Sequence, residues 1–343
     1  MLNFLQSIFR TAKPSDGPDE RLVTAAIERV VDGTDPRFRA VGVYRKLLWA
    51  PVARAVEHVV ALVDGMPTPV EISAARFAAD PRLRAFFVSV DHLRETVSFS
   101  EDLQKFLRNP PPLPEGTIHC LLTLDREERG VLGMALRGDA VSRDVAQVVV
   151  NFTHHRLVGM APSADEMRWE LKKRAFDHLI QTALAHLTAT REESERLTRQ
   201  RRLLEKKLAT LQAADLGIDA LMKPSGSPSA SPNDIDRELV GIEAELAALQ
   251  TDTTTLDGQL ASIAATLGEP EQHLRVEETS LTLDPMGVRL EGDAAANVAS
   301  IRLAELVSGA RRRVMLPGYV IRAELLPPRD FIAEAQRRLQ GNR

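Results

Sequence analysis

The chain has 343 residues, of which 44% are hydrophobic, 27% are charged and only 4% are aromatic, and its formal net charge is −4. This composition is typical of a soluble protein with two or three domains, and the charge gives no overall attraction for nucleic acid. The single cysteine, Cys120, excludes an internal disulfide and a multi-cysteine zinc site, and it favours a reducing, cytoplasmic location. No apolar run approaches the roughly 20 residues that span a bilayer.

Residues 1–19 are expected to form a separate N-terminal segment. A helix here would have one apolar face, made of Met1, Leu2, Leu5, Ile8 and Phe9. Such a helix could dock on its own domain, or it could lie on a membrane surface. Docking is favoured, because about a dozen residues bind lipid only weakly by themselves.

Residues 20–108 show the periodicity of a helical domain with four to six helices. Asp35-Pro36 and Asp80-Pro81 each predict a helix start, since aspartate caps a helix and proline suits its first turn. The sequence 98–101, Ser-Phe-Ser-Glu, predicts a capping box. The proline-rich stretch 109–114 then predicts a stiff linker and a domain boundary.

Beyond this linker the pattern changes to that of strands. Strands are expected at 117–124, 130–136 and 144–152, with the charged residues 125–129 as a turn between the first two. Further strands are expected at 275–283, 287–291, 299–307 and 313–325, and 328–343 should form a closing helix. Either half alone is too small to bury much, so the sequence predicts one composite β domain built from residues 113–162 and 269–327.

Residues 163–268, between the two β portions, have the strongest pattern in the chain. Apolar positions of the second half repeat in steps of four and three, which is the spacing of a coiled-coil seam. The seam consists of the apolar residues Ile235, Leu239, Ile242, Leu246, Leu249, Leu256, Leu260, Ile263 and Leu267, with the polar Thr253 at one core position. A Pro/Ser-rich stretch at 223–233 predicts a loop, so the two arms should form a helical hairpin.

The charges of the two arms favour an antiparallel pairing. Residues 190–211 hold seven basic and four acidic side chains, whereas 234–258 hold seven acidic and one basic. Folding about the loop places Arg199, Arg202, Lys206 and Lys207 opposite Asp252, Glu245 and Glu243. The predicted fold is therefore α+β, with an N-terminal helical domain and a composite β domain into which a long antiparallel coiled-coil hairpin is inserted.

One polar layer of the hairpin is the candidate partner-binding site. The coiled-coil frame places Arg201 and Thr253 at core positions close together, next to Arg202 and Asp252. This layer could be a register lock or a flexible point where a partner binds. Alternatively, it is a tolerated polar layer from which Arg201 extends to solvent.

No catalytic, cofactor or metal motif is recognised. Residues 133–138 have the two-glycine spacing of a phosphate loop, but Asp139 follows where lysine is needed. His154 and His155 would point to opposite faces of a strand, as would His119 and Cys120, so neither pair predicts a site.

The sequence therefore favours a non-enzymatic, cytoplasmic coiled-coil scaffold that binds another protein or itself, with no cofactor and no nucleic acid. Two alternatives remain. One is a peripheral membrane adaptor that uses the N-terminal helix, and the other is an enzyme without a readable motif.

Overall fold

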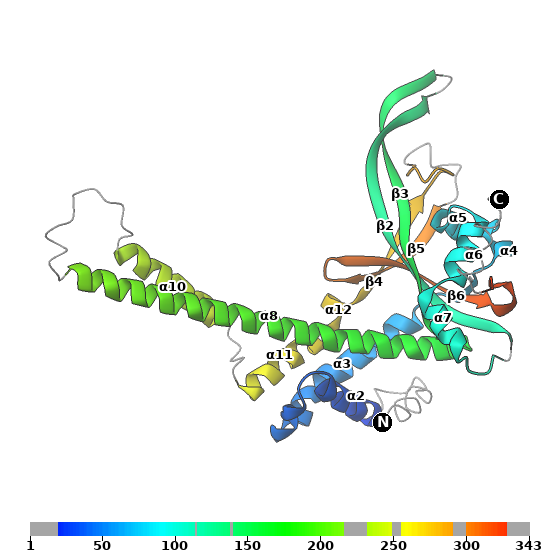
Figure 1. Cartoon of the computed structure of the whole chain (residues 1–343). Coiled ribbons are helices and arrows are strands. Elements are labelled where there is room, and N and C mark those ends of the chain that lie inside the picture. The colour runs from blue at the N-terminus through cyan, green and yellow to red at the C-terminus, as the bar shows by residue number, and fades with distance from the viewer. Residues whose placement is uncertain are drawn as a thin grey trace, which may run out of the picture. The chain divides into compact units, whose positions relative to one another are not determined.

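The computed structural model describes residues 20–113, 115–137, 140–215, 232–248, 255–290 and 300–327. Its helices and its antiparallel sheet confirm the predicted α+β class (Figure 1). The expected segment 1–19, the expected helix 328–343 and residues 223–231 of the expected loop lie outside the described residues.

The chain divides into two compact units, and the domain boundaries expected from the sequence stay predictions. The helical unit comprises Met1–Glu57 and Asp177–Pro270, and the sheet unit comprises His58–Phe176 and Glu271–Arg343. Helices α3 (Tyr44–Asp64) and α8 (Ala164–Asp215) contribute residues to both units.

The helical unit also contains α2 (Glu20–Gly33), the 3-10 turn η1 (Pro36–Ala40), α10 (Pro232–Ala248) and α11 (Leu256–Gly268). The expected cap at Asp35 is confirmed, since its side chain accepts a hydrogen bond from the backbone N–H of Arg37 and Pro36 begins the turn. Helix α2 buries one apolar stripe, which consists of Leu22, Val23, Ala26, Ile27, Val30 and Val31.

The sheet unit begins with short elements: β1 (Val70–Glu71), α4 (Ala74–Phe77), α5 (Pro81–Phe86), α6 (Val90–Ser98) and α7 (Glu101–Arg108). The expected cap at Asp80 is confirmed at the start of α5. The expected capping box at 98–101 is wrong. Ser98 ends α6 and its hydroxyl accepts from the N–H of Leu326, while Ser100 makes no side-chain cap hydrogen bond to α7.

The main strands of the sheet are β2 (Thr117–Arg137), β3 (Ala140–Ala161), β4 (Arg275–Thr282), β5 (Ser300–Ser308) and β6 (Arg311–Ile321); α12 (Pro270–His273) and η3 (Arg322–Glu324) flank them. The strand order is β3-β2-β6-β5-β4, and β1 pairs in parallel with β6. Strands from both sequence segments thus join one sheet, because β2 pairs with β6 over residues 117–124.

A short segment after β4 closes this sheet on itself. The N–H of Arg289 donates to the carbonyl of Val148 in β3, and the N–H of Val150 donates to the carbonyl of Gly287. On its other edge the segment returns to β4, where the N–H of Leu290 donates to the carbonyl of Thr282. The hydrogen-bonded order therefore returns to β3, as it does in a barrel.

One face of the sheet shares its hydrophobic core with α5, α6 and α7. Alternate residues of β2 supply it, namely Ile118, Cys120, Leu122 and Leu124. The helices supply Leu83, Phe86, Leu93, Val97 and Leu103, and Phe87, directly after α5, adds a further side chain. The other face packs Leu121 and Met315 against the end of α3 and the start of α8.

The turn expected at 125–129 is wrong, because β2 runs without interruption through these residues. Charged side chains among residues 125–129 form ion pairs with other strands of the sheet unit. These pairs allow so polar a sequence to form a strand. Asp125 pairs with Arg313 at 3.0 Å, and Arg126 pairs with Glu305 at 3.0 Å. Beyond these residues β2 and β3 continue as a long two-stranded ribbon (Figure 1).

Three bulges interrupt the pairing of β3 with β2. At each, two residues of β3 oppose one residue of β2, and one of the two has a positive φ: Asp144 (58°), His154 (52°) and Gly159 (65°). Bulges of this kind bend a strand and increase its twist. His154 and His155 thus occupy one bulge rather than the regular strand expected from the sequence.

Candidate functional site

The candidate site is the pair of helices that holds the predicted seam. We call Arg191–Asp215 of α8 together with α10 the arm. The amide of Gln200 in α8 donates to Oε1 of Glu238 in α10 over 3.2 Å. α10 lies alongside α8 in this part of the unit (Figure 1).

The side chains next to this hydrogen bond are apolar and buried. Ile235 and Ile242 lie three residues before and four residues after Glu238, so they share its side of α10, and they are only 2% and 4% exposed. On α8, Leu197 lies one turn before Gln200 and is 2% exposed. Of the first half of the predicted seam, Ile235 and Ile242 are buried, Leu239 and Leu246 are half-buried, and Leu249 lies outside the described residues, so the coiled coil itself stays a prediction.

The second half of the predicted seam belongs to a separate helix. Thr255 has extended backbone angles (φ −95°, ψ 150°), and its hydroxyl accepts from the N–H of Gly258, so a new helix begins at Leu256. An uninterrupted seam from Ile235 to Leu267 is therefore wrong. Threonine favours a cap because its hydroxyl satisfies a free N–H of the first turn. In this new helix, α11, Leu260, Ile263 and Leu267 are fully buried.

The base of the arm is held by a bidentate ion pair between α2 and α8. Nε and Nη2 of Arg29 donate to the two carboxylate oxygens of Asp177 over 2.8 and 2.9 Å. This hydrogen bonding outweighs desolvation and raises the pKa of Arg29. Two parallel N–H···O bonds also fix orientation, so the pair sets the position of α8 against α2.

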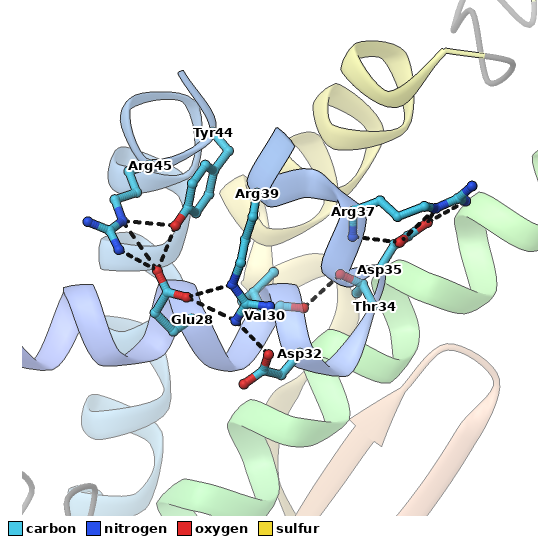
Figure 2. Close-up of polar contacts among 9 residues, drawn as sticks. All are labelled: Glu28, Val30, Asp32, Thr34, Asp35, Arg37, Arg39, Tyr44 and Arg45. Atoms are coloured by element: carbon cyan, nitrogen blue, oxygen red, sulfur yellow. Dashed lines mark hydrogen bonds and ion pairs between the residues drawn. The ribbon is translucent and has the colours of Figure 1, made fainter. Parts of the chain in front are cut away.

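A second polar cluster joins α2, η1 and α3 beside this base (Figure 2). Glu28 accepts from the hydroxyl of Tyr44 at 2.8 Å and from Arg45 and Arg39 at 2.9 and 3.0 Å. Burial opposes its ionisation, but these hydrogen bonds outweigh burial and lower the pKa of Glu28. Arg39 also reaches Asp32 at 2.6 Å. The cluster therefore fixes how α2, η1 and α3 pack.

A cavity of about 360 Å³ lies where α8, η1 and α11 meet. Phe38, Leu184 and Leu187 supply apolar lining, while Arg37 and Arg191 lie on its polar side. Both guanidinium groups already pair with acids, Arg37 with Asp35 and Arg191 with Glu195. The cavity therefore offers no uncommitted guanidinium to an anionic ligand.

The structure describes two of the four candidate partner-binding residues. Arg201 forms a 3.4 Å ion pair with Glu205 one turn later, and its Nε is buried without a hydrogen-bond partner. Arg202 is exposed. Asp252 and Thr253 lie outside the described residues, so the pairing of Arg201 with Thr253 stays a prediction.

The register of the two helices differs from the expected one. The sequence places Glu245 and Glu243 opposite a set that extends to Lys206 and Lys207, whereas Glu245 contributes to the raised pKa of Arg196, after the Glu193 hydrogen bond as the main cause. Basic residues recur along much of α8, so charge alone does not fix a register. The register seen in the structure follows the buried apolar side chains, because the hydrogen bond between Gln200 and Glu238 lies next to them.

The sheet unit holds the histidines and the cysteine considered above. Cys120 is fully buried, which raises the pKa of its thiol to about 12. His155 stacks on Phe87, and its Nε2 lies 2.7 Å from the carbonyl of Phe86. Burial lowers the pKa of His155. Within the described ranges, no three His, Cys, Asp or Glu side chains are placed to hold a metal ion.

Comparisons with known proteins supply no relative: no protein-family model matches this sequence, and no curated protein or solved structure is detectably similar to it. Among the described residues, no helix combines the length and the apolar character that crossing a membrane requires. The arm and its base are therefore interpreted from their own geometry.

Sequence reasoning identified the seam but missed the base of the arm. Arg29 and Asp177 are 148 residues apart, and neither belongs to a recognisable motif. The cap at Thr255 had a usable signal, because four threonines and an aspartate precede Leu256. Residues of these types favour caps and turns over helix interiors.

Proposed function

We propose that this protein is a non-enzymatic, cytoplasmic scaffold whose arm is an antiparallel coiled-coil hairpin that binds a protein partner. The observation that carries the proposal is the hydrogen bond between Gln200 and Glu238 beside the buried Ile235 and Ile242. It supports side-by-side pairing of α8 and α10 through two residues that are 38 positions apart in sequence.

The rest of the arm surface also supports a binding role. α8 is 52 residues long, which corresponds to about 78 Å, and most arm residues outside its buried stripe are exposed. A long polar helix is rarely stable alone, and burying one stripe against a second helix stabilises it. Such a pair leaves its outer faces available to another protein.

A shortened arm tests this function. Gln200 and Glu238 lie together, so residues 201–237 can be replaced by a short glycine-rich loop without separating the remaining helices. The tagged full chain and the shortened chain are purified from native extracts under identical conditions. We expect proteins, or further copies of the chain, to co-purify with the full chain only.

The shortened chain must keep the fold of the rest of the molecule. Circular dichroism and the fluorescence of Trp49 and Trp169, one tryptophan in each unit, serve as controls. An identical set of co-purifying proteins for both chains contradicts the proposal. So does a full chain that is strictly monomeric and has no partner.

A further inference from the structure

The outer surface of α8 has an exposed apolar residue surrounded by cations. Leu203 is 68% exposed. Its helical neighbours at positions −4, +3 and +4 are all basic, and the residue directly before it in sequence is also basic. We call this the basic face, and it consists of Leu203 with Arg199, Arg202, Lys206 and Lys207.

The outer surface of α10 has the opposite character. Val240 is 66% exposed, and Asp236 and Glu243 lie four residues before and three residues after it. The nearby cation Arg237 is already paired with Asp234 at 3.2 Å. We call Asp236, Val240 and Glu243 the acidic face.

Most charged side chains on these faces form no ion pair in the described part of the chain, although Nε of Arg199 donates to the backbone carbonyl of Glu195. Other cations of α8 pair along their own helix, as Arg196 does with Glu193 and Arg201 with Glu205. In contrast, Lys206, Lys207, Arg202, Asp236 and Glu243 form no ion pair with another residue in the described part of the chain.

One arm cannot bring its own two faces together. By helical spacing, the basic face lies on the side of α8 away from the buried Leu197, and the acidic face lies away from the buried Ile235 and Ile242. Each face is therefore open to a partner outside its own arm.

We propose that this partner is a second copy of the chain, whose acidic face docks on the basic face of the first. The inference rests on the proposed function and names the partner of the arm. Each face presents an apolar residue, Leu203 or Val240, within charges of one sign, and the two signs are opposite. Complementary charges of this kind guide encounter and select orientation, while the apolar centres exclude water.

The geometry also determines how the copies assemble. The contact is heterologous, since it joins two different surfaces. After one contact, the first copy still has a free acidic face and the second copy still has a free basic face. The two faces of one arm point in different directions, so association continues beyond two copies, and the average mass increases with protein concentration.

Charge reversal tests the proposal with purified full-length chains. The first variant carries Arg202→Glu, Lys206→Glu and Lys207→Glu, so both of its faces are acidic. The second carries Asp236→Lys and Glu243→Lys, so both of its faces are basic. Sedimentation velocity over a range of concentrations measures association of each variant and of an equimolar mixture.

We expect the unaltered chain to associate, and each variant alone to need at least about tenfold higher concentration for the same average mass. The mixture should recover association, because every contact then joins an acidic face to a basic face. Loss of folding cannot produce that recovery. Association of either variant alone as strong as that of the unaltered chain, or no recovery in the mixture, overturns the inference.

The outcome also separates this inference from the proposed function. A purified chain that stays monomeric, while the full chain but not the shortened chain captures another protein, overturns self-association and leaves the scaffold function standing. If the chain lacking residues 201–237 associates as strongly as the full chain, the arm is not the contact and the inference fails.

Discussion

Replacing Arg126 by methionine should strongly destabilise the sheet unit. The side chain of Glu305 is only 2% exposed, and Nη1 of Arg126 lies 3.0 Å from its Oε1. Nη1 makes no hydrogen bond, so the contact is an ion pair without hydrogen-bond geometry. The variant would leave a buried carboxylate without its nearest cation.

The expected cost follows from this burial. Removing one partner of a buried ion pair destabilises a protein by about 3–5 kcal/mol. Arg312 stays 3.8 Å from Glu305, but it is half exposed and its charge is partly screened by solvent. We therefore expect a loss near the lower end, about 3 kcal/mol. Replacing both partners, Arg126→Met with Glu305→Leu, should recover most of the loss, because no unpaired charge remains buried.

Urea unfolding measures these changes in the sheet unit. The chain has two tryptophans, and Trp49→Phe leaves Trp169, which belongs to the sheet unit, as the only reporter. Arg129→Met is the matched control, since Arg129 pairs with Glu127 at the surface of the same strand, and it should change stability little. A loss below about 1 kcal/mol for Arg126→Met refutes the reasoning. The reasoning is also refuted if the double variant, Arg126→Met with Glu305→Leu, is as unstable as Arg126→Met alone.

Three further predictions concern single residues. Cys120 should resist thiol reagents in the native protein, because the thiol is buried and its pKa is about 12; rapid labelling of the folded chain, followed by absorbance, would contradict this. Thr255→Ala should destabilise the helical unit by about 1 kcal/mol in thermal unfolding, while Thr255→Ser should not, because serine keeps the capping hydroxyl. His155 has a pKa below its ordinary value of 6.5, so the unfolded chain binds its proton more readily than the folded chain. Stability should therefore fall as pH drops through about 6.5, and His155→Gln should reduce this slope between pH 7 and pH 5; equal slopes would refute the assignment.

The sequence predicted those structural features that depend only on residues close together in the chain. The caps at Asp35 and Asp80 followed from aspartate before proline, and the buried stripe of α10 followed from the spacing of Ile235 and Ile242. The mixed class followed from the change of period after residue 114. Each of these signals acts within a few turns or within one strand.

Long-range contacts determined the features that could not be predicted. Residues 125–129 look like a turn because they are charged, but their partners, such as Glu305 and Arg313, come from strands far along the chain. The register of the arm depends on which apolar side chains meet, and a repeating charge pattern permits several registers. The ion pair between Arg29 and Asp177 forms only when α2 and α8 pack against each other.

The central claim is that α8 and α10 pair within one chain in the register set by Gln200 and Glu238. Cysteines at these two positions, in a Cys120→Ala background, can be joined by a short bis-maleimide. The account predicts a rapid link within one chain, and little link for cysteines at Lys207 and Glu243, which sequence charge alone would pair. Links only between chains, or faster linkage at Lys207 and Glu243, would contradict it.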